Sequence, residues 1–472
     1  MINYINIFKY INSKDMSQKK ISLNKKDEID SSSDESTSSS NDSDSEEELK
    51  EIKSSEDEES DSDSEEELTE QFSQLSHTLT KKLSKKIKKD NGIFFTPLDI
   101  IKTIYYFISD IENYEVKTVL EPSCGSCQFI NFLNEKYTGI SINGVEYNED
   151  IFKEIKKIDF GDDNKVSLIN EDFTKYDDKS KYDLIIGNPP YFVISKKNVD
   201  KKYSKYIDGR PNIYTVFILH SLKMLAKRGI LVFVLPKSFL NCLYYDKIRK
   251  HINENYKILA ILDHGMSDYI DTSQETCSVI IQNSQNTSNN PKYVMMFKSN
   301  TIFNYNINKL HKLVDNSTTL DAMGFEVNVG NVVWNQVKPL LTNDNKKCRL
   351  IYSGDISDNK LFLKKYGNSE KKNFIKKKGI REVMLVVNRG YGKGKYQFNY
   401  CLLNMDEEYL VENHLICIRY KKEIEKEKLL DLYEKIIKSF NDKKTEEFID
   451  YYFENNAINT SELQNILPIF LN

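Results

Sequence analysis

The sequence predicts an α/β protein in which a doubly wound, mainly parallel sheet over residues 91–285 is followed by an α+β domain over residues 292–472. In the first region, short apolar runs alternate with segments whose apolar residues recur at helical spacing. Residues 1–90 show neither pattern. We expect that segment to be disordered, acidic and Ser-rich at first and basic towards its end.

The first predicted helix of the α/β region follows Phe95-Thr96-Pro97. Thr96 suits the N-cap position because its hydroxyl can accept a hydrogen bond from a free backbone N–H. Pro97 suits the first helical position, which needs no donor. An apolar stripe follows at helical spacing: Ile100, Ile101, Ile104, Tyr105 and Ile108.

A turn of small residues follows the first predicted strand, which starts at Thr118 and ends at Glu121. The turn leads into an apolar segment at 129–133 with helical spacing. Small side chains let a ligand approach the backbone closely, so this strand–loop–helix unit is a candidate ligand loop. Its residues are Pro122, Ser123, Cys124, Gly125, Ser126 and Cys127.

Two further predicted strands end in carboxylates. The strand at 142–145 ends at Glu146, about 20 residues beyond the loop, where an acid can accept hydrogen bonds from a ribose diol. The strand at 167–171 ends at Asp172 and Phe173. That pair suits an adenine, since it offers an acceptor for the exocyclic amine and an apolar face for the ring.

The most informative stretch is Asn188-Pro189-Pro190-Tyr191, directly after a buried strand predicted at 182–187. Each proline fixes its own φ and favours extended geometry in the residue before it, so the four residues form a stiff shelf. In open α/β sheets, ligands bind at this end of the strands. The Asn188 side-chain oxygen and the Pro189 carbonyl can hold a planar amino group, and Tyr191 can lie flat on the ring that carries it.

The remaining elements of this region are a polar loop at 195–210, a helix at 213–225, and strands at 230–235 and 276–281. The loop carries six basic residues, Lys196 and Lys197 among them, with tyrosines interleaved. That composition is typical of a loop that contacts nucleic acid, and also of an ordinary exposed loop.

In this order, the motifs resemble the S-adenosylmethionine-dependent amino-methyltransferases. They most closely resemble the N6-adenine DNA methyltransferases of restriction–modification systems, in the group with the cofactor motif first and a C-terminal target recognition domain. The matching stretches run from 93 to about 282 and extend to 332–336 and 409–414. One departure is Cys127, which stands where such enzymes usually have a third small glycine.

The resemblance implies a Rossmann-like catalytic domain, S-adenosyl-L-methionine as cofactor, and double-stranded DNA as partner. It makes Asn188, Pro189, Pro190 and Tyr191 the catalytic residues. The implied cofactor-binding residues are Thr96, Glu121, Pro122, Ser123, Gly125, Glu146, Asp172 and Phe173. The expected substrate contacts are Tyr191, Tyr269, Lys196, Lys197, Arg389 and Lys393, although Tyr269 is equally well read as a packed tyrosine.

The expected chemistry is methyl transfer to the N6 amine of adenine, whose lone pair is conjugated into the ring. The two acceptors at Asn188 and Pro189 would orient the amine and favour localisation of that lone pair. The target base must leave the stack, because N6 of a duplex base is inaccessible. Alternatives are methylation of a protein glutamine, an RNA base or cytosine N4, and a catalytically silent DNA-binding module.

The C-terminal region is expected to recognise DNA. A low-complexity linker at Asn283–Asn290 precedes it. A basic, glycine-rich loop over 388–396 contains Arg389 and Lys393 and suits contacts to phosphates or a groove. The only tryptophan, Trp334, lies earlier in this region, and an amphipathic helix is predicted over 421–440.

Charge separates the chain into two parts. Residues 27–70 contain 21 Asp and Glu against two Lys, which leaves about +14 on the remainder of a chain with a formal charge of −5. The basic remainder suits a polyanion partner. The acidic segment either solubilises the protein or competes with DNA.

The sequence predicts an intracellular protein, cytoplasmic or nuclear. It has no apolar run of 18 residues and no secretory signal pattern, so no membrane contact is expected. The seven cysteines are scattered, which suits reduced thiols and argues against a metal site. We expect a monomer, with any restriction endonuclease a separate protein.

Overall fold

A computed structural model describes residues 71–209, 211–270, 272–366, 370–389, 397–453 and 458–471. The acidic segment at 27–70 and the candidate DNA contact Lys393 lie outside the described residues. No helix in the described ranges is long and apolar enough to cross a membrane.

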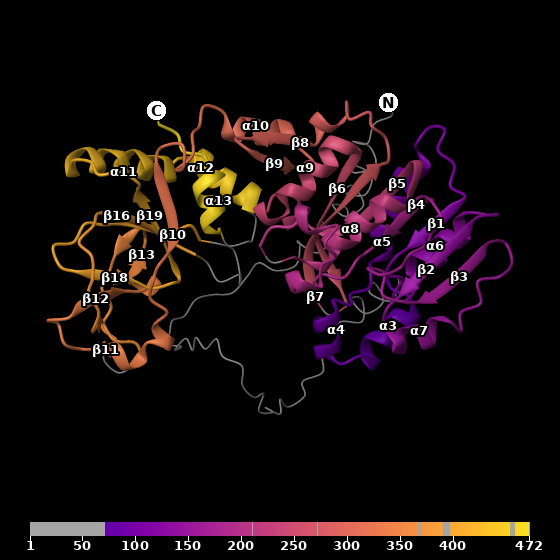
Figure 1. Cartoon of the computed structure of the whole chain (residues 1–472), viewed down its shortest axis with the longest axis horizontal. Helices are drawn as coiled ribbons and strands as arrows, with labels where there is room; N and C mark the ends of the chain where they lie inside the picture. The colour runs from indigo at the N-terminus through magenta and orange to yellow at the C-terminus, as the bar shows by residue number, and fades with distance from the viewer. Residues whose placement is uncertain are drawn as a thin grey trace, which may run out of the picture. The chain divides into compact units, whose positions relative to one another are not determined.

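The α/β region is built on a seven-stranded sheet in the order β3-β2-β1-β4-β5-β7-β6 (Figure 1). Five strands run parallel: β3 (Lys165–Asn170), β2 (Ser141–Glu146), β1 (Thr118–Glu121), β4 (Tyr182–Gly187) and β5 (Leu225–Pro236). The last two, β7 (Thr272–Gln282) and β6 (Lys257–Tyr269), are antiparallel to their neighbours. The predicted fold class, a doubly wound sheet with mainly parallel strands, is confirmed.

Helices cover both faces of this sheet. They are α5 (Leu98–Ser109), α6 (Gln128–Lys136), α7 (Glu149–Ile155), α8 (Ile213–Met224) and α9 (Asp246–Asn255). Successive residues of a strand point to opposite faces. In β4, Ile185 therefore shares a core cluster with residues of α8 and α9. Its neighbours Leu184 and Ile186 belong to the other cluster, which contains Ile101 of α5 and Ile151 of α7.

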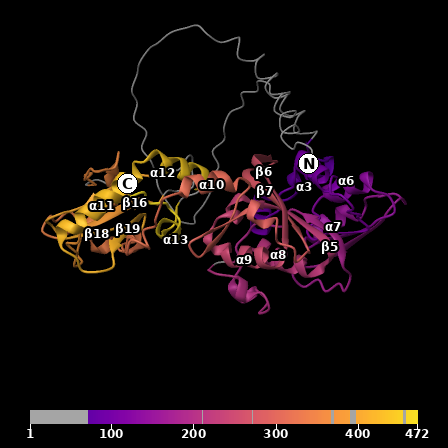
Figure 2. The same cartoon turned by 90° about the horizontal axis from the view of Figure 1, so that it is seen from above.

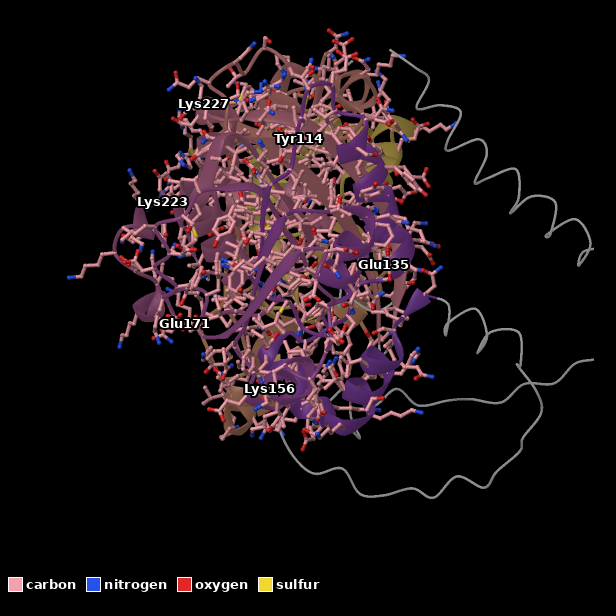
Figure 3. All side chains as sticks on the ribbon, turned by 90° about the vertical axis from the view of Figure 1, so that its right-hand side faces the viewer. Tyr114, Glu135, Lys156, Glu171, Lys223 and Lys227 are labelled. Carbon is pink, nitrogen blue, oxygen red and sulfur yellow. The ribbon has the colours of Figure 1, made fainter. Side chains whose placement is uncertain are left out.

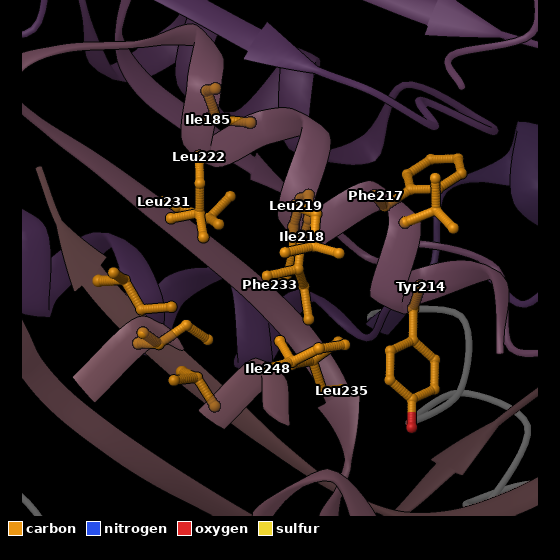
Figure 4. Close-up of a cluster of buried hydrophobic side chains, with 14 of the residues drawn as sticks. Ile185, Tyr214, Phe217, Ile218, Leu219, Leu222, Leu231, Phe233, Leu235 and Ile248 are labelled. Atoms are coloured by element: carbon orange, nitrogen blue, oxygen red, sulfur yellow. The ribbon is translucent and has the colours of Figure 1, made fainter. Parts of the chain in front are cut away.

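The core on the α8 side is a large cluster of aliphatic and aromatic side chains. Figure 4 shows Ile185, Leu231 and Phe233 of the sheet among residues of α8 such as Phe217 and Leu222. All five are less than 7% exposed. Burying a side chain of this size contributes roughly 1.5–3 kcal/mol, so this cluster holds the strand ends in fixed positions.

Part of the predicted disordered segment is helical, which corrects the boundary at residue 90. Helices α3 (Gln74–Lys82) and α4 (Lys85–Asn91) precede the α/β region. This segment has an apolar face: Phe72, Leu79 and Leu83 are buried in the cluster that contains residues of α5 and α6. Lysines dominate the composition, but these three side chains decide where the segment packs.

The start of α5 differs from the prediction by one residue. The helix begins at Leu98, and Pro97 takes the N-cap position with extended geometry and no side-chain cap. Thr96 is therefore not the N-cap. The carbonyl of Pro97 accepts from Ile101 N at 3.4 Å, so the chain turns into the helix after the proline.

The predicted linker at 283–290 is fixed to the sheet region instead of being free. The Asn290 side chain is buried, accepts from Ile258 N at 2.8 Å, and donates to Tyr256 O at 2.9 Å. Asn283 donates to Ala226 O at 2.9 Å. Its polar composition suggests a linker, but these asparagines satisfy backbone groups at the starts of β5 and β6.

In the described part of the C-terminal region there are two four-stranded sheets and two short hairpins, which confirms the α+β prediction. The first sheet has β10 (Phe325–Val329), β19 (Leu415–Tyr420), β16 (Met384–Asn388) and β17 (Tyr400–Leu403). The second has β11 (Leu341–Thr342), β15 (Phe374–Ile375), β12 (Cys348–Ile351) and β18 (Tyr409–Val411). The hairpins are β8 (Val294–Phe297) with β9 (Asn300–Phe303), and β13 (Ile356–Ser357) with β14 (Lys360–Leu361).

Among the described residues, four α-helices accompany these sheets: α10 (Ile307–Val314), α11 (Lys426–Phe440), α12 (Lys443–Phe448) and α13 (Thr460–Asn465). Helix α11 starts at Lys426 instead of at 421 and ends where expected. Its residues Tyr433 and Ile436 share a core cluster with Leu385 of β16 and Ile418 of β19. Figure 2 shows α11 beside these strands.

Candidate active site

The carboxyl ends of the parallel strands border a cavity of about 800 Å³. Its volume lies in the range of small-molecule sites. Of the residues expected from the sequence, nine line it: Pro122, Ser123, Gly125, Glu146, Asp172, Phe173, Asn188, Pro190 and Lys197. A recess of about 30 Å³ beside it is lined by Thr96 and Glu121, together with Ser123, Gly125 and Asn188.

The ligand loop after β1 has the tight geometry that its small residues predict. Cys124 N donates to Val145 O of β2 at 2.9 Å, which ties the loop to the neighbouring strand. Gly125 has φ of +51°, and a Cβ there would lie 3.3 Å from the Phe95 ring. Cys127, at the place of the expected glycine, also takes a left-handed conformation with φ of +60° and is fully buried.

Glu146 is held by backbone N–H groups at the end of β2. Its two carboxylate oxygens accept from Gly125 N at 2.9 Å and from Asn148 N at 2.7 Å. Burial raises the pKa of the side chain to about 6, and the backbone N–H groups partly offset this effect. Each oxygen keeps a further lone pair, so the carboxylate can still accept from a diol in the cavity.

Asp172 and Phe173 lie together on the cavity wall after β3. Asp172 Oδ1 accepts from Thr174 N at 3.0 Å and from the Thr174 hydroxyl at 2.7 Å. The Phe173 ring packs against Phe217 of α8, with ring centroids 4.9 Å apart. An acceptor and a fixed aromatic ring therefore stand side by side, as the sequence predicts.

The Asn188 side chain is held at both ends of its amide. Its Nδ2 donates to Phe94 O at 3.2 Å, and its Oδ1 accepts from the Tyr191 hydroxyl at 2.5 Å. The Asn188 carbonyl accepts from the Ser123 hydroxyl at 3.2 Å, which joins the shelf to the ligand loop. An amide oxygen has two lone pairs, so Oδ1 retains one acceptor position.

Tyr191, Pro189 and Tyr269 do not line the cavity. The Tyr191 hydroxyl also lies 2.8 Å from Val234 O, and its ring packs edge-on against Tyr214 at 5.9 Å between centroids. Tyr269 is 5% exposed, and its hydroxyl lies 3.5 Å from Thr276 Oγ1. In this structure, both tyrosine rings pack within the domain, and neither belongs to the cavity lining.

Glu121 is the least satisfied acid of the site. It is 3% exposed, and its Oε2 has no hydrogen-bond partner among the described residues. Burial raises its pKa well above the usual range, and Cys127 and Glu146 raise it further. An unpartnered buried oxygen at the wall of the recess suits a cationic group such as the ammonium of an amino acid.

The polar loop after the shelf is anchored to the domain, and part of it forms the cavity wall. The Tyr203 hydroxyl hydrogen-bonds His220 Nδ1 at 2.8 Å, and the Lys223 ammonium lies 4.4 Å from the Tyr203 ring centroid. Figure 3 shows Lys223 at the margin of the domain. Lys197 lines the cavity, whereas Lys196 is exposed outside its lining.

The last expected contacts lie in the C-terminal region. Arg389 is exposed at the end of β16, where its backbone N–H donates to His414 O at 3.1 Å. It does not line the cavity. Among the residues that the structure describes, no group of three His, Cys, Asp or Glu side chains is placed to hold a metal ion.

Sequence reasoning missed much of the apolar cavity wall and the segment before Phe95. The missed lining residues include Asn91, Gly92, Phe94, Phe192, Val199, Ile213 and Phe217. Phe192 directly follows the shelf, and Phe217 belongs to the predicted helix, so both positions carried a signal. Gly92 and Phe94 gave no comparable signal because their partners lie far along the chain.

Residues 9–270 match the Eco57I restriction-modification methylase family. The chain belongs to this family. S-adenosyl-L-methionine is accordingly its cofactor, and the cavity, the two acids and the aromatic wall suit such a ligand in size and in chemistry.

Two related proteins can be aligned with this methylase over nearly the whole of their own length. Modification methylase CviBIII of Paramecium bursaria Chlorella virus NC1A is 28% identical over 405 residues, which are 85% of this chain and 99% of the relative. Type II methyltransferase M.CvrRI of Paramecium bursaria Chlorella virus XZ-6E is 29% identical over 413 residues, which are 84% of this chain and 99% of the relative.

Similarity to solved structures is weaker. The methyltransferase subunit of a type I restriction-modification system from Streptococcus thermophilus is 17% identical, with a TM-score of 0.36. The match covers 45% of this chain and 50% of that subunit.

Proposed function

We propose that this methylase transfers a methyl group from S-adenosyl-L-methionine to the N6 amine of an adenine flipped out of double-stranded DNA. Support comes first from membership of a restriction-modification methylase family. The observation that best supports an amine as the methyl acceptor is the arrangement of the Asn188 amide. Its Nδ2 donates to Phe94 O, and its Oδ1, which accepts from the Tyr191 hydroxyl, keeps a second lone pair that can accept a hydrogen bond from a substrate N–H.

The proposed roles follow the chemistry of each side chain. Asn188 Oδ1 and the Pro189 carbonyl accept from the target amine, and the two prolines keep these acceptors rigid. Tyr191 fixes Oδ1 through its hydroxyl and contacts the flipped base once the base has entered. The cofactor, when bound, supplies an electrophilic methyl group.

The cofactor is proposed to lie along the ends of β1, β2 and β3. Glu146 would accept from the ribose diol, and Asp172 and Phe173 would contact the adenine. The loop residues Pro122, Ser123 and Gly125 allow close approach of the ligand. Thr96 and Glu121 line the recess and would receive the amino-acid end.

We propose that the protein binds double-stranded DNA, mainly through the C-terminal domain over 292–472. The charge of about +14 outside residues 27–70 supports a polyanion partner. The cations proposed to contact DNA are Lys196, Lys197, Arg389 and Lys393. Tyr269 is proposed as a second contact to the target base, after a local rearrangement that opens its face. We propose a monomer with any endonuclease on a separate chain.

A labelled-methyl assay tests the proposed function. The purified enzyme would be incubated with cofactor carrying a tritiated methyl group and with duplex DNA, RNA or a mixture of proteins. The expected product is N6-methyladenine in hydrolysed DNA. Label in cytosine, in RNA or in polypeptide, with DNA adenine unlabelled, would contradict the proposed substrate.

The Asn188→Ala variant tests the assigned residue. It removes the acceptor and is expected to lower kcat by at least about 100-fold, as loss of a single transition-state hydrogen bond does in other sites. Cofactor affinity should remain close to that of the parent enzyme. An equal loss of both quantities would show that Asn188 belongs to the cofactor site.

A further inference from the structure

The orientation of the Asn188 amide is set by a segment far away in the sequence. Phe94 lies 94 residues before Asn188, and its carbonyl accepts from Asn188 Nδ2 at 3.2 Å. If the amide were turned over, Oδ1 would face the Phe94 carbonyl and two acceptors would meet. The Phe94 carbonyl therefore determines which end of the amide is available to a substrate.

The same segment lies directly against the shelf at Gly92. Gly92 ends α4 in a left-handed conformation with φ of +61°. A Cβ at this position would lie 2.7 Å from Tyr191 N and 3.1 Å from Pro190 Cβ. Both distances are too short for an ordinary contact, so only glycine allows this approach.

The segment before Gly92 is anchored to the ligand loop. The Ser76 hydroxyl of α3 lies 2.7 Å from the Ser126 hydroxyl and donates to Gln128 Oε1 at 3.0 Å. Ser76 and Ser126 are 0% and 2% exposed. Further along α3, Lys82 forms an ion pair with Glu154 of α7 at 2.7 Å. These contacts fix α3 relative to the loop, to the start of α6 and to α7.

We propose that Gln74–Phe94 is a positioning strap, in which Gly92 seats the Asn188–Tyr191 shelf and the Phe94 carbonyl turns Asn188 Oδ1 toward the target amine. This inference rests on the proposed function because it takes Asn188 as the residue that contacts the amine. Gly92 and Phe94 act through Asn188 and are positioning residues. Their effect should appear in the transfer step and not in cofactor binding.

The Gly92→Ala variant tests the seat of the shelf. The new Cβ would displace the shelf by a fraction of an ångström, and we expect kcat to fall by roughly 10- to 100-fold with cofactor Kd nearly unchanged. The matched control is Gly161→Ala. Gly161 has a similar φ of +68° but no described heavy atom within 4 Å of its Cβ position, so this variant carries the backbone strain without the collision.

The Asn188→Asp variant tests the role of the Phe94 carbonyl. An ionised carboxylate can accept from the target amine but cannot donate to Phe94 O, so activity at pH 8 should be low. A protonated carboxyl restores a donor for Phe94 O and leaves an acceptor for the amine. Activity of the variant relative to the parent enzyme should therefore rise as pH falls from about 8 to about 5.

The outcomes separate this inference from the proposed function. If Gly92→Ala matches Gly161→Ala in kcat, or if the relative activity of Asn188→Asp does not rise at low pH, the strap does not position the shelf. Either result would still be compatible with the proposed N6 methylation, provided that Asn188→Ala is inactive. If Asn188→Ala retains activity, the proposed catalytic residue itself is wrong. Unchanged cofactor Kd in Gly92→Ala would exclude misfolding as the cause of a loss.

Discussion

Replacing Glu146 by glutamine should weaken cofactor binding, although the two side chains have almost the same shape. Glu146 already accepts from two backbone N–H groups, Gly125 N and Asn148 N. A glutamine has one oxygen and one NH₂ group, so one of these N–H groups would face another donor. The substitution also removes the negative charge that would accept from the ribose diol.

Two opposing contributions should leave the stability of the Glu146→Gln variant nearly unchanged. A buried N–H without an acceptor costs about 1–3 kcal/mol. Against this, the pKa of Glu146 is raised from 4.5 to about 6 by burial, so at neutral pH its charge costs about 2 kcal/mol in the folded protein. Glutamine avoids that cost, and the two effects are of similar size.

For cofactor affinity, no second effect offsets the loss of the charge in Glu146→Gln. Hydrogen bonds to a charged acceptor are stronger than those to a neutral amide, and loss of the charge from a diol contact should cost about 2–3 kcal/mol. This corresponds to a rise in cofactor Kd of roughly 30- to 140-fold. The parent enzyme should also bind less tightly in acid, because protonation of Glu146 below pH 6 removes the same charge.

The sign of the pH effect differs between binding and stability. Cofactor Kd of the parent enzyme should rise by up to about tenfold between pH 7.5 and pH 5, since about one molecule in ten then has an ionised Glu146. The raised pKa has the opposite effect on folding: its stabilising contribution is fully present below pH 4.5 and is lost as pH rises through about 6.

Calorimetric titration of the full chain with S-adenosyl-L-methionine measures these effects. The matched control is Glu149→Gln, which changes an exposed carboxylate three residues away. Thermal unfolding of each variant shows whether the fold is intact. A Glu146→Gln variant whose Kd stays within about threefold of the parent at pH 7.5 would refute the assigned contact.

Three further outcomes are expected. Asp172→Ala should raise cofactor Kd about tenfold by loss of an acceptor, and an unchanged Kd in calorimetry would count against the adenine contact. Deleting residues 1–70, which keeps α3 and α4, should raise DNA affinity at low salt and less at high salt, as measured by fluorescence anisotropy; equal affinities would exclude competition by the acidic segment. Cys127→Val should unfold at a lower temperature than Cys127→Gly, because a β-branched residue is strained at φ of +60°, and equal melting temperatures would contradict this reasoning.

The strand ends and the ligand loop could be predicted because their signals are local. A buried strand followed by small residues, an acid or a double proline can be recognised within about ten residues. Glu146, Asp172 and Phe173 are therefore assigned to one edge of the sheet from the sequence alone. Parallel strands bring such ends together, and nine of the expected residues line the same cavity.

The contacts that complete the site could not be predicted in this way. Asn188 with Phe94, and Ser126 with Ser76, join residues 94 and 50 positions apart, and nothing in the sequence around Phe94 or Ser76 points to the distant partner. The prediction of disorder was wrong for 71–90 because the lysines there outnumber the apolar residues that fix the segment. Tyr191 and Tyr269 were expected to face a base, yet packing places their rings outside the cavity lining.

The anchoring of α3 has a consequence for synthesis of the chain. A ribosome makes this helix before Ser126 and Gln128, and before strands β4, β5 and β7, whose residues share its core cluster, so Leu79 and Leu83 stay without these partners until they have been made. Cotranslational closure of the catalytic domain thus requires residues well past the shelf. Nascent chains arrested before residue 188 should remain sensitive to protease near Leu79, and those released after the last strand of the sheet should not.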